Sequence, residues 1–318
     1  MRNKVAISII AAMLLIWLIP SAAGASPEER FGGDNRYETA VILSEISWEN
    51  EAEDVVLARG DEFADALAST PFAAKVDGPI LLTEQDNLTR ASYDEIRRLG
   101  AQKVWVMGGS NAISDKVINQ LENMPGVEVE RIAGKDRVET SVKIAKRVDS
   151  TPGEAIVVNR DSFADAIAIG PYAAKKQVPI ILSDKNALNT TNRSYLEKAG
   201  KTYVIGGKAV LSDNVYKAVN KADRISGENR YVTSVRIADR FFPGGDMPII
   251  ATGEKFADGL TGSLLAAKRN QPILLVQHNH ADDEVKRYFY FNDVANYTVL
   301  GGYNAVHQYI YAQLVAGR

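Results

Sequence analysis

Short apolar runs alternate with amphipathic segments along the chain, and the pattern is clearest between residues 131 and 223. Apolar residues at helical spacing predict helices, and short β-branched runs between them predict buried strands. The predicted helices cover 137–148, 161–175, 191–198 and the segment after Ser212, and the predicted strands cover 155–158, 179–182 and 202–205. Strands that alternate with helices form parallel sheets with helices on both faces. We therefore predict an α/β fold with a three-layer arrangement.

Four sequence motifs recur three times in the same order, so the chain contains an internal repeat. The motif copies are Arg-x-x-Gly-x-x-Arg starting at 30, 131 and 224; Phe-Ala-Asp at 63–65, 163–165 and 256–258; a Pro-Ile strand motif with Ile80, Leu81, Leu82, Ile180, Ile181, Leu182, Ile273, Leu274 and Leu275; and glycine pairs at Gly108, Gly109, Gly206, Gly207, Gly301 and Gly302. We predict three tandem modules with parallel sheets, at 26–130, 131–223 and 224–318.

The segment before the first predicted helix indicates how the modules join. Strand-like segments end modules one and two, whereas module three ends on a predicted helix and residues 29–31 stand alone near the other end of the chain. We hypothesise that 29–31 fills the vacant strand position of module three and closes the modules into a triangle. Deletion of 26–33 without loss of stability would contradict this hypothesis.

The first 25 residues have the layout of a secretory signal peptide. Arg2 and Lys4 precede an apolar run from Val5 to Leu18, and a small-residue segment ends at Ala25. We therefore predict a signal peptide at 1–25 and export of the mature protein. No second long apolar run follows, so we expect no membrane span after cleavage.

Composition narrows the classes of partner. The chain has no cysteine, so core burial rather than disulfides must stabilise an exported fold, and thiol chemistry is excluded. The formal net charge is −3, and removal of Arg2 and Lys4 makes the mature chain more acidic. A basic field for nucleic acid is therefore absent, and any anion binding must be local.

The second arginine of each Arg-x-x-Gly-x-x-Arg motif stands at the first position of a predicted helix; these residues are Arg36, Arg137 and Arg230. Each follows a predicted helix cap: Asn35, Asp136 or Asn229. A cation is unfavourable there because the helix N-terminus is already positive. The compensating anion could be internal, as a structural ion pair with one of three aspartates in the first turn of another helix: Asp65, Asp165 and Asp258. It could also be a ligand, because free helix N–H groups and a guanidinium suit phosphate or carboxylate, and the two can share an arginine.

The arginines, the Phe-Ala-Asp motifs and the glycine pairs all follow predicted strands. They should therefore lie at the carboxyl edge of the sheets, where open α/β sheets bind ligands. The glycine pairs could form tight turns with positive φ or could allow close approach of a ligand. The Pro-Ile motifs are most simply interpreted as buried central strands.

Residues suited to catalysis are few. The three histidines, His278, His280 and His307, all lie in module three, so no repeated site can use histidine as a base. Common hydrolase and nucleotide-binding motifs are missing. Asp61 and Asp65 could hold Mg²⁺, but Asp61 reads more simply as a helix cap. We expect no catalytic residue, metal or cofactor.

With these four motifs in order three times, residues 30–318 resemble the type 2 cell-wall-binding repeat family of Gram-positive bacteria, as found in clostridial surface-layer proteins and autolysins. The resemblance implies Toprim-like or Rossmann-like modules around a pseudo-threefold axis. It also implies non-covalent retention at the cell wall through an anionic, teichoic-acid-like polymer. By the same resemblance, the polymer site would involve the helix-start arginines and the neighbouring Ile-Leu segments.

The sequence thus favours a secreted, non-enzymatic wall-binding protein. A metal-dependent wall hydrolase, or a protein that modifies an autolysin, is the alternative, and a wall hydrolase is a possible partner. Modules two and three carry extra basic residues on their first helices: Lys143, Arg147, Arg236 and Arg240. We predict that these two modules supply more of the polymer affinity, unless these side chains form only a solvated face.

Overall fold

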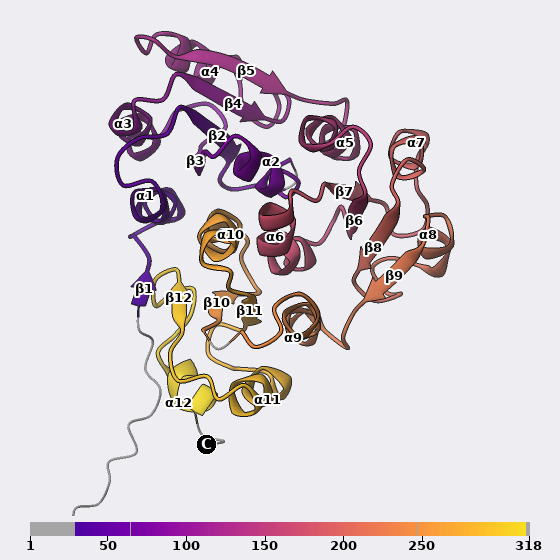
Figure 1. Ribbon diagram of the computed structural model, residues 1–318. Coiled ribbons are helices and arrows are strands. Elements are labelled where there is room, and N and C mark those ends of the chain that lie inside the picture. The colour runs from indigo at the N-terminus through magenta and orange to yellow at the C-terminus, as the bar shows by residue number, and fades with distance from the viewer. Residues whose placement is uncertain (1–28, 64, 246, 316–318) are drawn as a thin grey trace, which may run out of the picture.

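The computed structural model describes residues 29–63, 65–245 and 247–315, which form three four-stranded parallel sheets arranged in a triangle (Figure 1). Helices alternate with the strands and cover the sheets, as predicted. The predicted signal peptide, 1–25, lies outside the described residues. Within the described ranges, no helix is both long and apolar enough to cross a membrane.

The modules have matching elements. Module one contains α1 (Arg36–Ser47), β2 (Asp54–Arg59), α2 (Thr70–Lys75), β3 (Ile80–Thr83), α3 (Arg90–Leu99), β4 (Lys103–Met107), α4 (Asp115–Glu122) and β5 (Glu128–Ile132). Module two contains α5 (Arg137–Val148), β6 (Glu154–Asn159), α6 (Ala164–Lys176), β7 (Ile180–Ser183), α7 (Thr190–Leu196), β8 (Lys201–Ile205), α8 (Asp213–Lys217) and β9 (Ala222–Ile225). Module three contains α9 (Arg230–Phe241), β10 (Ile249–Thr252), α10 (Ala257–Arg269), β11 (Ile273–Val276), α11 (Asp283–Phe291), β12 (Thr298–Leu300) and α12 (Tyr309–Val315).

The first strand of the chain completes the last sheet. The sheet orders are β3-β2-β4-β5, β7-β6-β8-β9 and, for module three, β11-β10-β12-β1. Strand β1 (Glu29–Phe31) pairs in parallel with β12, with Glu29 opposite Thr298 and Phe31 opposite Leu300. It takes the position that β5 and β9 hold in the other sheets. The predicted closure by residues 29–31 is therefore confirmed.

Each Arg-x-x-Gly-x-x-Arg motif crosses from one module to the next. Its first arginine lies in the last strand of one sheet, β1, β5 or β9, and its second arginine begins the first helix of the following module. Strands β5 and β9 consequently extend across the repeat boundaries at 130/131 and 223/224. The sequence repeat and the folded module are therefore offset by part of a strand.

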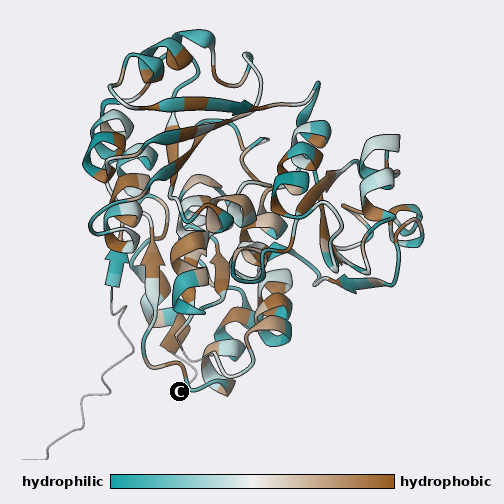
Figure 2. Ribbon diagram, turned by 45° about the horizontal axis from the view of Figure 1, so that its top comes forward, coloured by the Kyte–Doolittle hydropathy of each residue, from teal (hydrophilic) through white to brown (hydrophobic). Residues whose placement is uncertain are grey.

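Helices α2, α6 and α10 meet in the middle of the triangle (Figure 1), where the ribbon is mostly hydrophobic (Figure 2). Small residues allow their close approach. A Cβ added to Gly170 of α6 would lie only 2.8 Å from Ser263 Oγ of α10. Ala166 and Ala168 of α6 are likewise buried. Close packing of these three helices therefore joins the modules in a single core.

The Pro-Ile strands β3, β7 and β11 are edge strands, so their interpretation as central strands was wrong. They are nevertheless buried because the first helix of each module packs along the edge. The hydroxyl of Ser141 on α5 accepts a hydrogen bond from Leu182 N at 3.0 Å, and Ser234 on α9 does the same for Leu275 N at 3.0 Å. A helix thus satisfies edge N–H groups that a further strand would otherwise bind.

In module one the central helix begins later than predicted. Helices α6 and α10 begin directly after phenylalanine, whereas α2 begins at Thr70, so Asp65 lies in a turn rather than in a helix. The Ser69 hydroxyl donates to Ala66 O at 2.5 Å, and such a local bond competes with helix formation.

Candidate functional site

The motif arginines begin capped helices, as predicted. The side chain of Asn35 accepts hydrogen bonds from Tyr37 N and Glu38 N, and Asp136 accepts one from Glu139 N. Asn229 caps α9 in the same way. These bonds satisfy donors that the first helical turn leaves free.

Each helix-start arginine donates to a backbone carbonyl in the loop after a strand of its own module. Arg36 Nη1 lies 2.5 Å from Gly60 O, and Arg230 Nη1 lies 2.5 Å from Gly253 O. Arg137 Nη1 lies 3.2 Å from Arg160 O and 3.3 Å from Asp161 Oδ1. The backbone therefore holds each guanidinium near the carboxyl edge of the sheet.

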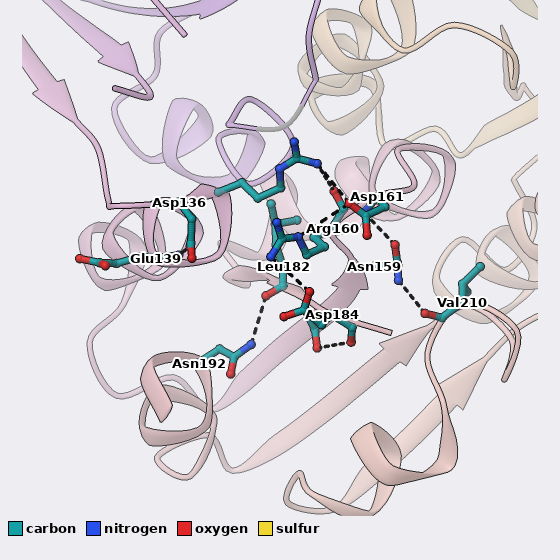
Figure 3. Close-up of polar contacts among 11 residues, drawn as sticks. Asp136, Glu139, Asn159, Arg160, Asp161, Leu182, Asp184, Asn192 and Val210 are labelled. Carbon is teal, nitrogen blue, oxygen red and sulfur yellow. Dashed lines mark hydrogen bonds and ion pairs between the residues drawn. The ribbon is translucent and has the colours of Figure 1, made fainter. Parts of the chain in front are cut away.

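In module two, that edge carries a small polar network (Figure 3). Arg160 reaches Asp184 Oδ1 at 3.2 Å, and Asn159 Oδ1 accepts a hydrogen bond from Asp161 N at 2.7 Å. Asn159 also donates to Val210 O at 2.6 Å, which ties β6 to the loop after β8. Asp161 is therefore part of a network with Arg137 and Arg160 that modules one and three do not reproduce residue for residue.

The predicted arginine–aspartate relationship exists, but it runs between modules. The charge of Arg137 and the hydroxyl of Thr140, both in module two, lower the pKa of Asp65 in module one. The charge of Arg230 in module three does the same for Asp165 in module two. Arg36 and Thr39 of module one lower the pKa of Asp258 in module three. In the described part of the chain, neither Arg36 nor Arg230 has a carboxylate within 4.0 Å. The predicted ion pairs are thus replaced by longer-range attraction.

Burial dominates the ionisation of these aspartates. Burial raises the pKa of Asp165 to about 6, and the positive charge of Arg230 opposes that rise. Burial also raises the pKa of Asp65 and of Asp258, while threonine hydroxyls and the facing arginines lower them. Removing the charged carboxylates from water costs free energy that the distant arginines only partly return. Each boundary therefore pairs a carboxylate of raised pKa with an arginine from the next module.

The phenylalanines of the three Phe-Ala-Asp motifs meet on the pseudo-threefold axis of the modules, a contact that the motif spacing alone does not reveal. The ring centroids of Phe63 and Phe163 are 5.5 Å apart, those of Phe63 and Phe256 5.8 Å, and those of Phe163 and Phe256 6.3 Å. Arg36 Cζ lies 5.9 Å from the Phe256 ring centroid and Arg230 Cζ lies 5.4 Å from that of Phe163. The signal was present, since phenylalanine precedes the same Ala-Asp pair in all three copies.

The boundary between modules three and one contains a crevice of about 570 Å³. Arg36 and Asn35 line it from the start of α1, Lys255 and Asp258 from the start of α10, and Tyr303 from the loop after β12. The crevice lies beside Phe256, which also lines it. Two cations, two carboxylates, Asp34 and Asp258, and an aromatic ring therefore converge on one solvent-accessible space.

The first glycine of each pair is required for the turn. Gly108, Gly206 and Gly301 have φ values of 96°, 113° and 88°, a region that L side chains rarely adopt. A Cβ at these positions would lie 2.6, 2.6 and 2.3 Å from an aspartate oxygen, that of Asp65, Asp165 or Asp258 respectively. The second glycine differs, because Gly302 lines the crevice and a Cβ there would meet nothing closer than 3.8 Å.

The first arginine of each Arg-x-x-Gly-x-x-Arg motif has a structural role that the sequence analysis did not assign. Arg131 Nη1 donates to Gly108 O at 2.9 Å and to Ile113 O at 2.8 Å. Arg224 makes equivalent bonds to Gly206 O and Leu211 O. These arginines fix the glycine turn of the module whose last strand they occupy.

The Ile-Leu segments are placed in the core. The side chains of Ile80, Leu81, Leu82, Ile180, Ile181, Leu182, Ile273, Leu274 and Leu275 are 0–2% exposed. Such side chains cannot touch a polymer without local unfolding. Their contribution to any site is to support the adjoining carboxyl edge.

The extra basic residues of modules two and three have acidic neighbours. Arg147 pairs with Glu130, Arg240 lies 3.4 Å from Asp223, and Lys143 lies 3.5 Å from Glu139. Arg236 lies 3.9 Å from Asp239. These pairs support the interpretation as a solvated face and weaken the reason for expecting greater affinity in these modules.

The residues considered for metal binding do not come together. Asp61 pairs with Arg59 at 2.5 Å, and this hydrogen bond lowers the pKa of Asp61. Across residues 29–63, 65–245 and 247–315, no group of three or more histidine and acidic side chains is arranged to hold a metal ion.

The family model that describes cell wall binding domain 2 matches the chain three times, at residues 30–118, 131–216 and 224–311. The protein belongs to this family. Its three matched segments each lie within one of the three predicted repeats, and the match confirms the resemblance seen in the sequence.

This chain spans only part of the length of each of the following relatives. The N-acetylmuramoyl-L-alanine amidase LytC of Bacillus subtilis is 29% identical over 99% of this chain, which spans 63% of LytC. The amidase enhancer of B. subtilis is 36% identical over 79% of this chain and 35% of its own length. Cwp6 and Cwp8 from Clostridium difficile both superpose with TM-scores of 0.82 over 91% of this chain, at 28% and 29% identity, and the match covers 48% and 51% of those chains.

Proposed function

We propose that this protein is a secreted, non-catalytic wall-binding protein that is retained at a Gram-positive cell surface by an anionic, teichoic-acid-like polymer. The observation that carries the proposal is the repeated placement of Arg36, Arg137 and Arg230 at helix N-termini beside module boundaries. A guanidinium group suits phosphate or carboxylate because it can donate two parallel hydrogen bonds to such an anion. Membership of the cell wall binding domain 2 family supports the same conclusion.

The proposed site at each boundary combines one helix-start arginine, the second glycine of a pair and the capped helix N-terminus. The polymer would contact Gly109, Gly207 and Gly302 rather than the buried first glycines. Three sites on one rigid body can hold a repeating polymer through avidity even when each site is weak. Because charge dominates, attachment should weaken as salt screens the sites.

The test is co-sedimentation of residues 26–318 with purified cell walls, before and after chemical removal of their anionic polymers. We expect binding to native walls, loss of binding to stripped walls, and weaker binding by the combined Arg36→Ala, Arg137→Ala and Arg230→Ala variant. A Lys143→Ala plus Arg147→Ala variant is the matched control, because it removes exposed cations that lie outside the crevice between modules three and one. Equal binding to stripped and native walls would contradict the proposal.

A role beside a wall hydrolase is a separate proposal, supported by similarity to LytC and to the amidase enhancer. Pull-down of an amidase by the mature protein from wall extracts, lost after wall polymers are removed, would indicate co-localisation on the polymer rather than direct contact.

A further inference from the structure

The three boundaries share a plan but differ at the residue that follows the glycine pair. This residue is Ser110 at the boundary of modules one and two, Lys208 at that of modules two and three, and Tyr303 at that of modules three and one. Lys208 is held by Asp213 at 2.8 Å. Tyr303 is 57% exposed and lines the 570 Å³ crevice. Since serine and lysine occupy the same turn elsewhere, folding of the turn does not require an aromatic ring.

Tyr303 is held in place from one side. Arg30 Cζ lies 4.5 Å from the centroid of the Tyr303 ring. Three hydrogen bonds fix Arg30 itself. Its Nη1 donates to Gly301 O at 2.5 Å, its Nη2 to Val306 O at 2.8 Å, and its Nε to Tyr311 Oη at 2.9 Å. An anchored cation therefore supports one face of the ring, so binding at its exposed surface would cost little ordering of the side chain.

The same crevice places two cations next to each other, and Asp34 and Asp258 also line it. Lys255 lines it beside Arg36, whereas the positions equivalent to Lys255 are Glu62 and Ser162 at the other boundaries. In the described structure, Arg36 has no carboxylate within 4.0 Å, while Arg137 has Asp161 at 3.3 Å. An exposed ring beside two cations fits a ligand that has both an apolar face and a negative group.

We propose that Tyr303 is a sugar-stacking subsite, which binds a pyranose ring of a phosphate-bearing glycan while Arg36 and Lys255 bind the adjacent phosphate. The C–H groups on one face of a pyranose carry partial positive charge and meet the negative face of an aromatic ring. The amide groups of Asn35 and Asn304, which also line the crevice, can hydrogen-bond sugar hydroxyls. This inference rests on the proposed function and makes the three sites unequal, with the crevice between modules three and one recognising the sugar.

The test compares two polymers, poly(glycerol phosphate) without sugar and the same polymer substituted with N-acetylglucosamine. Binding of residues 26–318 is measured for the wild type and for Tyr303→Ser, which installs the module-one residue, Tyr303→Phe, which keeps the ring, and Tyr309→Ser. Tyr309 is the matched control because it is 65% exposed in the same module and does not line the crevice.

We expect the wild type to prefer the sugar-substituted polymer and Tyr303→Ser to lose on the order of tenfold in affinity for it. Tyr303→Phe and Tyr309→Ser should bind like the wild type, and none of the variants should change affinity for the unsubstituted polymer. Equal loss for both polymers would make Tyr303 a support for the phosphate site and would overturn the inference.

Two further outcomes also overturn the inference while leaving the proposed function intact. One is equal binding of both polymers by the wild type; the other is binding to native walls but to neither polymer. Failure of the wild type to sediment with native walls, by contrast, would overturn the proposed function itself. Unfolding midpoints of the variants, measured in parallel, separate lost contacts from lost folding.

Discussion

Arg30 Nη1 donates a hydrogen bond to the carbonyl oxygen of Gly301, at 2.5 Å and across 271 residues of chain. Arg131 and Arg224 make the equivalent bond within contiguous modules. The same local interaction therefore joins the first strand of the chain to module three in one place, which closes the triangle of modules, and stabilises a single module in the other two.

Replacing Arg30 by alanine should lower the free energy of unfolding by about 2–4 kcal/mol, because three buried or half-buried acceptors lose a charged donor. Deletion of 26–33 should lower the free energy of unfolding further, since β12 also loses its partner strand. Urea unfolding of residues 26–318 is the measurement. Lys135→Ala is a control, as Lys135 is an exposed residue of the equivalent motif in module two; unchanged stability of the deletion would contradict closure by β1.

The two glycines of a pair should respond differently to alanine. Gly206→Ala should destabilise by about 2 kcal/mol or more, because the residue has φ 113° and its Cβ would lie 2.6 Å from Asp165 Oδ2. Gly207→Ala should change stability by less than about 0.5 kcal/mol, since its Cβ would lie 3.9 Å from the nearest atom. Thermal unfolding of the two variants compares them directly. Similar losses of stability in the two variants would show that the turn as a whole, rather than the close approach to the buried carboxylate, requires glycine at position 206.

Asp165 should make the protein less stable as pH rises from about 4 to 7. Burial raises the native pKa of Asp165 to about 6, above the unfolded value of about 3.9, so the native state binds the proton more tightly. The stability that this group contributes is fully present below about pH 4 and is lost as pH rises through about 6.

Asp165→Asn should therefore leave stability at pH 4 nearly unchanged and raise it at pH 7 and above by up to about 3 kcal/mol. Urea unfolding across this pH range is the measurement. Asp61→Asn is a control with the opposite expected effect. The hydrogen bond from Arg59 lowers the pKa of Asp61, so removal of this carboxylate should slightly lower the free energy of unfolding at neutral pH. A pH profile of Asp165→Asn parallel to that of the wild type would refute the assignment.

Phe63→Ala should destabilise the protein by about 2–3 kcal/mol, because it removes one ring from the cluster on the threefold axis. Phe291→Ala, at a ring that is 77% exposed, should have little effect. The measurement is the free energy of unfolding in urea. A small effect of Phe63→Ala would mean that the central helices, without the ring cluster, determine how the modules join.

Much of the fold could be predicted because the periodicity is strong and repeated. The helix predicted at 137–148 is α5 with the same bounds, and the vacant strand position was identifiable because two modules ended on a strand and one did not. The position of β3 at a sheet edge was missed, since burial by a helix and burial by a strand leave the same apolar run. The late start of α2 was also missed, since it accompanies a local bond of the Ser69 hydroxyl that the hydrophobic pattern does not reveal.

The candidate site was predicted less completely than the fold. The sequence identified the helix-start arginines and the aspartates, but it could not show that each arginine faces the aspartate of the preceding module. That relationship depends on the angle at which modules pack. The roles of Phe63 and Arg131 were also missed, although both recur in every copy, because a repeated residue does not reveal which of its neighbours it contacts.

The position of β1 also determines the order in which the molecule can be completed as the chain is synthesised. Strands β2–β5 and β6–β9 are contiguous in the chain, so the first two sheets can form as soon as their own segments have emerged. The third must retain a place for a strand that emerged first, some 270 residues before β12. The crevice beside Tyr303 is therefore assembled last, from the segments at 32–39, 255–258 and 302–305, and only a molecule that contains all three segments can present it.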